Sequence, residues 1–266
     1  MSKKTILAVA VATLAFGQLA KAQTNIQVFY DFAQDRQYVT TTIEGFYGDK
    51  WGNTFFFVDH DFNNRANNGK IISPNGTYME IARCLKFWQN TKRGGLSAHV
   101  EYNGGIYNEY SINHAVLAGL DYFFHSKDYK NTLNVKVLYK WIDYGGALDA
   151  NGKKVHSAVP MQFTLVWGMQ DLFGLKGLRF SGFADFWWES HTVCPWLNDK
   201  NAGYRDWTKA ETSQVVFISE PQLWYNVGQW FGVPNLNIGG EVELSVNFGT
   251  LKGFRARPCL GAKWVF

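Results

Sequence analysis

The last thirteen residues, 254–266, alternate without a break between two kinds of side chain, and no other feature of the chain constrains the fold as strongly. The apolar set is Phe254, Ala256, Pro258, Leu260, Ala262, Trp264 and Phe266. The other set is mostly polar or cationic: Arg255, Arg257, Cys259, Gly261, Lys263 and Val265. Successive side chains of a β-strand point to opposite faces of its sheet. The segment is therefore predicted to be a strand with one apolar face and one wet face.

Composition indicates what covers the apolar faces of such strands. Aromatic residues make up 17% of the chain, yet no run of about 18 apolar residues follows residue 22, so no membrane-spanning helix is expected there. Many aromatic residues combined with period-two patterning are typical of a transmembrane β-barrel, whose strands face lipid outside and water or polar side chains inside. A β-sandwich or a lipocalin-like soluble barrel is the alternative fold.

The N-terminal sequence has the pattern of a cleaved signal peptide. Lys3 and Lys4 precede a mainly apolar stretch, and Ala20-Lys21-Ala22 supplies small residues where a signal peptidase cuts. We expect residues 1–22 to be removed and residues 23–266 to form one domain. The mature chain would carry 23 basic and 22 acidic side chains, a balance that indicates no nucleic-acid partner. An ordinary buried N-terminal helix is the alternative.

Alternating segments between turn clusters predict an all-β fold, a twelve-stranded antiparallel transmembrane β-barrel. The expected strands are 25–34, 38–48, 53–62, 77–88, 95–103, 111–124, 131–142, 157–170, 177–189, 213–226, 235–248 and 253–266. Most reach the roughly nine to eleven residues that a tilted strand needs to cross a membrane.

Connection lengths support the same fold independently. With both termini in the periplasm, the periplasmic connections are 48–52, 89–94, 125–131, 171–176 and 228–234, all short. The opposite set includes the long segments 62–76, 143–156 and 189–212. Short turns at one end and long loops at the other are the pattern of outer-membrane barrels.

A few residues do not fit the alternation. The parity of strand 77–88 sends Arg83 toward lipid, and His60 falls on an apolar face. Either a β-bulge shifts the register or these side chains lie near the membrane interface. The three cysteines, Cys84, Cys194 and Cys259, are not expected to form a disulfide framework.

Several segments resemble the nucleoside-specific channel-forming outer-membrane proteins (Tsx-like), or a Bacteroidetes-type outer-membrane family related to them. They are 48–53 with 55–59 (GDKWGN, FFFVD), 77–81 (TYMEI), 139–145 (YKWIDYG) and 178–186 (LRFSGFADF). The resemblance implies a monomeric barrel in the outer membrane of a Gram-negative bacterium, with a narrow pore that binds nucleosides. The terminal Phe266 is similar to the C-terminal signature that the barrel-assembly machinery reads.

Strand parity assigns charged residues of both signs to the lumen. The predicted pore-lining charges are Asp59, Glu80, Arg179, Asp185, Glu241, Glu243, Arg255, Arg257 and Lys263. Glu241 and Glu243 are expected to pair with Arg255, Arg257 or Lys263 on the neighbouring strand. A ring of one sign would select ions, whereas this mixture favours neutral polar solutes. The alternative is that the charges only satisfy a polar interior.

The same parity brings aromatic rings into the lumen. Phe29, Phe57, Phe183 and Trp187 are the predicted solute-binding side chains, because nucleobases stack on aromatic faces and a channel needs weak, repeated sites. Alternatively, these rings plug the interior or anchor loops.

These features predict passive uptake of small polar solutes, with nucleosides as the first candidate, and no enzyme activity. The best catalytic pair, Ser97 with His99, faces the lumen rather than the lipid. No cofactor is expected, and the sequence shows no His, Cys and carboxylate cluster at zinc spacing. A lipid-modifying enzyme, or a closed structural or receptor barrel acting through the loop 189–212, remains the alternative.

Overall fold

The structure is a computed structural model, and it describes residues 22–62, 76–92, 94–107 and 111–266. The predicted signal peptide lies outside the described residues, apart from Ala22, and stays a prediction. The strands are β1 Ala22–Asp31, β2 Val39–Asp49, β3 Gly52–Phe62, β4 Gly76–Leu85, β5 Leu96–Tyr107, β6 Ser111–His125, β7 Asn131–Asp143, β8 Met161–Gln170, β9 Leu178–Val193, β10 Glu211–Ser219, β11 Gln222–Tyr225, β12 Leu236–Val246 and β13 Phe254–Val265. Among the described residues, no helix is long and apolar enough to cross a membrane.

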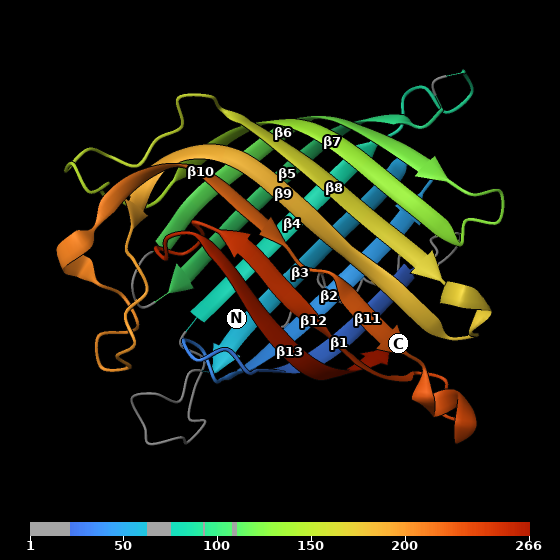
Figure 1. The fold of residues 1–266 in the computed structure, drawn as a ribbon. Helices are drawn as coiled ribbons and strands as arrows, with labels where there is room; N and C mark the ends of the chain where they lie inside the picture. Colours follow the sequence, from blue (N-terminus) through green and yellow to red (C-terminus); the bar gives the residue numbers. More distant parts are fainter. Residues whose placement is uncertain (1–21, 63–75, 93, 108–110) are drawn as a thin grey trace, which may run out of the picture.

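These strands close into one antiparallel barrel, which Figure 1 shows with its strands strongly tilted. Apart from β10 and β11, which do not pair with each other, each strand pairs with the next along the chain, and β1 pairs with β13 from Asn25↔Val265 to Asp31↔Cys259. The short strands β10 and β11 both lie between β9 and β12 and share one place in the wall. In the part of the chain that is described, the barrel therefore has twelve strand positions, and the predicted fold is confirmed.

The interruption between β10 and β11 has a local cause. It falls at Glu220 and Pro221, and proline has no N–H for a sheet ladder. Gly182 on the neighbouring strand β9 lies against this interruption. A Cβ atom at position 182 would be only 2.4 Å from the carbonyl oxygen of Glu220. Glycine at position 182 therefore lets the displaced backbone pack closely against β9.

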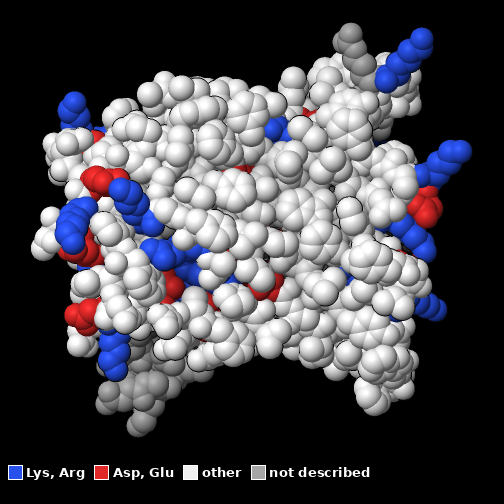
Figure 2. Space-filling view, viewed as in Figure 1, with Lys and Arg blue, Asp and Glu red and all other residues white. Residues whose placement is uncertain are grey.

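The outer wall of the barrel is apolar. Every second residue of a strand points outward, and many of these outward residues are apolar and exposed, among them Ile26, Val100, Leu120, Val137 and Leu260. Figure 2 shows charged side chains gathered at the two ends of the molecule and a mostly uncharged wall between them on this face. A wide exposed apolar band around a closed barrel is the surface that a lipid bilayer covers.

The connections differ at the two ends, as predicted. One end, at the right of Figure 1, has connections 50–51, 86–95, 126–130, 171–177 and 226–235. The other end has the long loops 144–160 and 194–210, while the predicted long loop 62–76 lies mostly outside the described residues. We therefore assign the first end to the periplasm and the second to the outside.

The two residues that broke the alternation lie at the rims of the barrel. Strands β3 and β4 pair without a register shift from Gly52↔Leu85 to Asp61↔Gly76, so no bulge is involved. Arg83 forms an ion pair with Asp49 at 2.8 Å beside the periplasmic turn. His60 contacts the Thr77 hydroxyl at 3.0 Å near the other end of the strand pair. Both polar side chains thus find partners at interface depth.

The extracellular loop 144–160 is anchored by Asp149. Its carboxylate accepts hydrogen bonds from the backbone N–H of Asn151 and Lys153 and from the Ser190 hydroxyl, at 2.8, 3.0 and 3.0 Å. The backbone hydrogen bond from Lys153 is the largest influence that holds the pKa of Asp149 below its usual value of 3.8. Asp149 therefore fixes the loop against the end of β9.

Candidate functional site in the barrel lumen

The lumen is partly packed and partly wet. Some inward-facing side chains are fully enclosed, such as Gln27 at 1%, Leu138 at 0% and Trp224 at 2% exposure. In contrast, four inward-facing carboxylates are only half-buried: Asp59, Glu80, Asp185 and Glu241. Solvent-accessible space therefore remains around these carboxylates, while side chains fill the lumen elsewhere.

A cluster of ion pairs narrows the extracellular part of the lumen. Arg257 on β13 pairs with Glu243 on β12 at 2.5 Å and with Asp35 at 2.8 Å. Arg36 reaches the same Glu243 at 2.5 Å and Asp31 at 3.3 Å. Asp35 and Arg36 belong to the connection 32–38 between β1 and β2, so this connection folds inward. We call these five residues the arginine–carboxylate cluster.

The predicted pairing of the two glutamates on β12 is confirmed for Glu243, whereas Glu241 has no ion-pair contact with β13 among the described residues. Glu243 lies directly opposite Arg257, whereas Glu241 lies opposite Cys259. The carboxylate of Glu241 accepts its hydrogen bond from the Gln222 amide at 2.7 Å instead. The register of β12 against β13 therefore decides which glutamate meets a guanidinium.

The other predicted pore-lining charges find mixed partners. Asp59 accepts a hydrogen bond from the Thr42 hydroxyl at 2.5 Å, and Glu80 accepts one from the Tyr78 hydroxyl at 2.5 Å. Asp185 accepts a hydrogen bond from Thr164. Hydroxyl groups thus hold these carboxylates in place. Two residues lie nearer the mouths, Arg179 exposed at the periplasmic end and Arg255 with its guanidinium 4.7 Å from the Trp196 ring centre.

The four predicted aromatic residues lie in three places rather than in one continuous group. Phe29 packs against Trp224 with ring centres 5.5 Å apart, and Phe57 packs against Tyr78 at 5.8 Å. Phe183 and Trp187 belong to a third cluster with Val216, Ile218 and Phe248.

Lysine ammonium groups cover two of the lumen indole rings. Lys140 lies 3.6 Å from the ring centre of Trp187, and Lys263 lies 4.2 Å from that of Trp224. Strand parity places all of these residues in the lumen. It does not show which of them meet, because each contact joins two strands that do not follow each other in the chain. Cation–π attraction therefore helps to fix both rings in the lumen.

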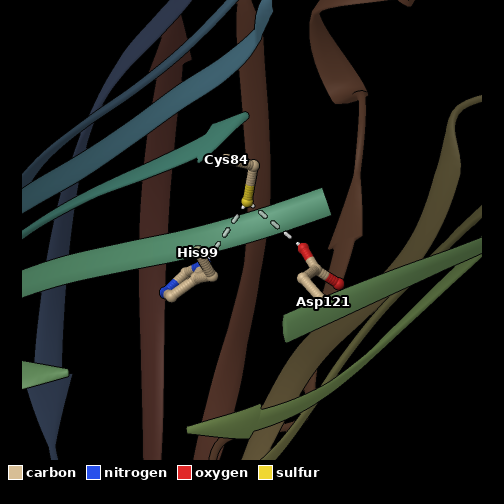
Figure 3. Close-up of side chains that lie close together, drawn as sticks. All are labelled: Cys84, His99 and Asp121. Atoms are coloured by element: carbon tan, nitrogen blue, oxygen red, sulfur yellow. Dashed lines mark hydrogen bonds between the residues drawn. The ribbon is translucent and has the colours of Figure 1, made fainter. Parts of the chain in front are cut away.

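One polar cluster escaped the sequence analysis. Cys84 on β4, His99 on β5 and Asp121 on β6 come together inside the barrel, and their ligand atoms all lie within 4.8 Å of one another (Figure 3). The Cys84 sulfur is 3.3 Å from His99 Nδ1 and 3.2 Å from Asp121 Oδ2. The sequence separations of 15 and 37 residues match no local motif. The shared inward parity of the three positions was the only available signal.

The same region contains Ser97 and His99, the pair weighed above for catalysis. Ser97 donates its hydroxyl to the carbonyl oxygen of Asp121 at 3.3 Å. The two ring nitrogens of His99 contact Cys84 and Glu101, the latter at 2.9 Å. The hydrogen bonds of Ser97 and His99 therefore go to other residues, whereas the two side chains of a catalytic Ser–His pair bond to each other.

Cavities lie at both mouths of the barrel. The extracellular cavity, about 200 Å³, is lined by Ala33, Gln34, Asp35, Trp196, Phe254, Arg255, Ala256 and Arg257. The periplasmic cavity, about 340 Å³, is lined by Lys86, Gly94, Gly95, Tyr122, Phe123, Phe124, His125 and Tyr129. The arginine–carboxylate cluster borders the first cavity, and the Cys84–His99–Asp121 cluster lies beside the second.

Solved structures agree with this architecture. The porin NanC, in a rhombohedral crystal form, matches with a TM-score of 0.53 over 91% of this chain and 98% of the NanC chain, at 8% identity. The KdgM porin in complex with disordered oligogalacturonate gives a TM-score of 0.43, with 92% and 99% coverage and 9% identity. OprD from Pseudomonas aeruginosa gives 0.37, with 93% and 95% coverage and 10% identity. The likeness to NanC concerns the fold, which is that of a porin.

The closed barrel and its apolar wall identify an outer-membrane protein of a Gram-negative bacterium. No curated protein matches the sequence. Residues 22–266, nearly the whole chain and all of the barrel, match one family profile. The chain therefore belongs to the family described as Domain of unknown function (DUF5020).

Proposed function

We propose that this protein is a channel for passive diffusion of small polar solutes across the outer membrane, with nucleosides as the first substrate class to test. The observation that carries the proposal is solvent-accessible space inside a closed barrel, around the half-buried inward carboxylates Asp59, Glu80, Asp185 and Glu241. A barrel that served only as a membrane anchor would need no such space. The proposed activity is transport without catalysis.

Nucleosides are proposed because of aromatic rings beside this wet space. Phe183 is half-buried on β9, and Trp187, four residues later on the same inward face, is buried with Lys140 over its ring. Stacking of a base on an aromatic ring contributes about 1–3 kcal/mol in sites that tolerate any base. The resemblance of segments such as 77–81 and 178–186 to nucleoside-specific channels supports the same substrate class. Charges of both signs in the lumen favour a neutral solute.

Liposome swelling tests the proposal. Vesicles with the folded protein should take up nucleosides faster than sugars or amino acids of similar mass, and Phe183→Ala or Trp187→Ala should slow nucleoside entry selectively. Trp188→Ala is the matched control, because Trp188 is the next residue on β9 and its ring packs against Phe163 and Phe186 on the outer face. Equal entry for all solutes would reject the nucleoside proposal. The absence of swelling would reject the channel and favour a closed barrel.

The arginine–carboxylate cluster is proposed to limit the conductance. Arg36→Ala removes the side chain that joins the connection 32–38 to Glu243 on β12 and to Asp31. We expect a several-fold rise in single-channel conductance in planar bilayers, because the Arg36 side chain no longer fills this part of the lumen and the connection is then held only by the Asp35–Arg257 ion pair among the pairs of the cluster. Lys252→Ala is the control, since it breaks an exposed ion pair with Glu211 at the same rim. Unchanged conductance in Arg36→Ala would place the narrowest point elsewhere.

In the membrane we propose a monomer surrounded by outer-membrane lipid and inserted by the barrel-assembly machinery through the terminal Phe266. Phe266 is 73% exposed, and its backbone N–H donates to the Thr24 carbonyl at 2.9 Å beside the seam of β1 and β13. An exposed terminal ring next to the closing seam is available for recognition before the barrel closes. Deletion of Phe266 should lower the amount of assembled barrel in the outer membrane.

A further inference from the structure

We propose that Cys84, His99 and Asp121 form a binding site for a thiolate-preferring divalent cation, Zn²⁺ above all, inside the periplasmic half of the barrel. This inference does not depend on the channel proposal. Thiolate sulfur, imidazole nitrogen and carboxylate oxygen are the donors that zinc binds in proteins.

The register of three neighbouring strands assembles the donors. Cys84 on β4 lies directly opposite His99 on β5. On β6, Gly119 lies opposite His99 and Asp121 lies opposite Ser97, so Asp121 is the diagonal neighbour of His99. Diagonal neighbours on one face of a sheet remain within reach of longer side chains. Three sequential strands thus present three different donors to one point on the inner wall.

The distances between the donor atoms fit a tetrahedral ion. Zinc bonds of about 2.3 Å to sulfur and about 2.0–2.1 Å to nitrogen or oxygen put tetrahedral donors about 3.5 Å apart. The Cys84 sulfur is 3.3 Å from His99 Nδ1 and 3.2 Å from Asp121 Oδ2. The third pair of donors, on His99 and Asp121, lies within 4.8 Å, so binding of one ion would draw these two donors together by at most about 1.3 Å.

A second layer of side chains orients two of the donors. His99 Nε2 is 2.9 Å from a carboxylate oxygen of Glu101, so Glu101 can hold the proton on Nε2 and leave the Nδ1 lone pair for the metal. The Asn134 amide donates to both oxygens of Asp121, at 2.8 and 2.9 Å. A carboxylate behind a ligating histidine is the usual second layer of a zinc site.

Charge balance favours the ion as well. Cys84, His99 and Asp121 are 5%, 1% and 2% exposed, and beside them Lys136, opposite Asp121 on β7, and Glu101 add one charge of each sign, so the charge of Asp121 is left over at a buried position. When the ion binds, the Cys84 S–H bond breaks, the sulfur keeps the electron pair and bonds the metal, and the proton leaves to solvent. A dication with one thiolate, one carboxylate and a neutral imidazole has no net charge.

A cavity lies close to the site. The periplasmic cavity of about 340 Å³ is lined by Lys86, Gly95 and Phe123 among others. Phe123 lies two residues from Asp121 on the same face of β6, and Lys86 lies two residues from Cys84, just beyond the end of β4. The cavity is therefore one inward row away from the donors. A fourth position on the ion, open toward this side, would be filled by water or by a solute.

Cobalt absorption tests the site in refolded protein whose barrel is verified by heat-modifiable migration on a gel. Co²⁺ should give a thiolate-to-cobalt charge-transfer band and the strong visible bands of four-coordinate cobalt, and Zn²⁺ should abolish both. Cys84→Ser should remove the charge-transfer band. Glu101→Gln should keep the band and weaken cobalt binding by about 10–100-fold.

The other two cysteines provide the matched control. Cys194 and Cys259 are also buried and free, so the double variant Cys194→Ser/Cys259→Ser leaves Cys84 as the only thiol in residues 23–266. A charge-transfer band in this variant assigns the ligand to Cys84 even if Cys84→Ser does not fold. Folded wild-type protein without the band in excess Co²⁺, or a band that survives in folded Cys84→Ser, would overturn the proposal and leave a hydrogen-bonded cluster.

Discussion

Replacing Arg257 by methionine is expected to destabilise the folded barrel by about 3–5 kcal/mol, because it leaves the buried carboxylate of Asp35 without its ion-pair partner and leaves Glu243 with Arg36 alone. The Arg257 side chain is 4% exposed and holds Glu243 at 2.5 Å and Asp35 at 2.8 Å. Methionine keeps much of the side-chain volume, so the loss comes from charge rather than from a cavity. Urea unfolding in lipid vesicles, followed by tryptophan fluorescence, measures the free energy of unfolding.

Arg255→Met is the control for this prediction. Arg255 precedes Arg257 by two residues on the same face of β13, and its guanidinium lies over the Trp196 ring at 4.7 Å. A cation–π contact contributes about 0.5–2 kcal/mol, so the cost should be clearly smaller. Equal costs for both variants would contradict a buried ion-pair cluster and indicate that water reaches Glu243 and Asp35. Asp35→Asn in the Arg257→Met background should recover part of the loss, since it removes one unpaired charge.

The substitution Leu120→Arg is expected to lower the free energy of unfolding by about 2–4 kcal/mol, which is the penalty for a cation near the middle of the lipid face of a barrel. Leu120 is 50% exposed on the outer wall of β6. On a water-exposed surface the same substitution would cost little, because a solvated arginine is harmless. The free energy of unfolding in vesicles again measures the effect.

Leu148→Arg is its matched control, because Leu148 is 54% exposed but lies in the extracellular loop 144–160. We expect its free energy of unfolding to stay within about 0.5 kcal/mol of the wild type, as for most surface substitutions. The pair separates exposure to lipid from exposure to water at nearly equal exposed fractions. Equal, small effects at both positions would contradict the membrane-spanning wall.

The sequence was sufficient for the strands and their faces, because side-chain alternation is a local property of an extended chain. The predicted strand 131–142 corresponds to β7 Asn131–Asp143, and strand 235–248 to β12 Leu236–Val246. The largest differences lie at strand ends, where β9 continues to Val193 and β8 begins only at Met161. These ends border the loops 144–160 and 194–210. Side-chain alternation does not show at which residue the pairing between strands stops.

The lumen shows where local pattern is not enough. Parity correctly placed Glu241 and Glu243 on one face, but the register against β13 gave only Glu243 a guanidinium. The same glutamate also receives Arg36, which is 207 residues away in the chain. Nothing in the segment 32–38 indicates that it folds into the barrel rather than out to water.

What the sequence alone determined is therefore the class of fold: amphipathic strands, an even number of them, and long loops at one end only. What only the tertiary structure decided is which inward side chains meet, including the arginine–carboxylate cluster and the site of Cys84, His99 and Asp121. The physical reason is that alternation depends on neighbouring residues in the chain. Contacts in the lumen depend instead on strand register and barrel closure, which bring together residues that are far apart in the sequence.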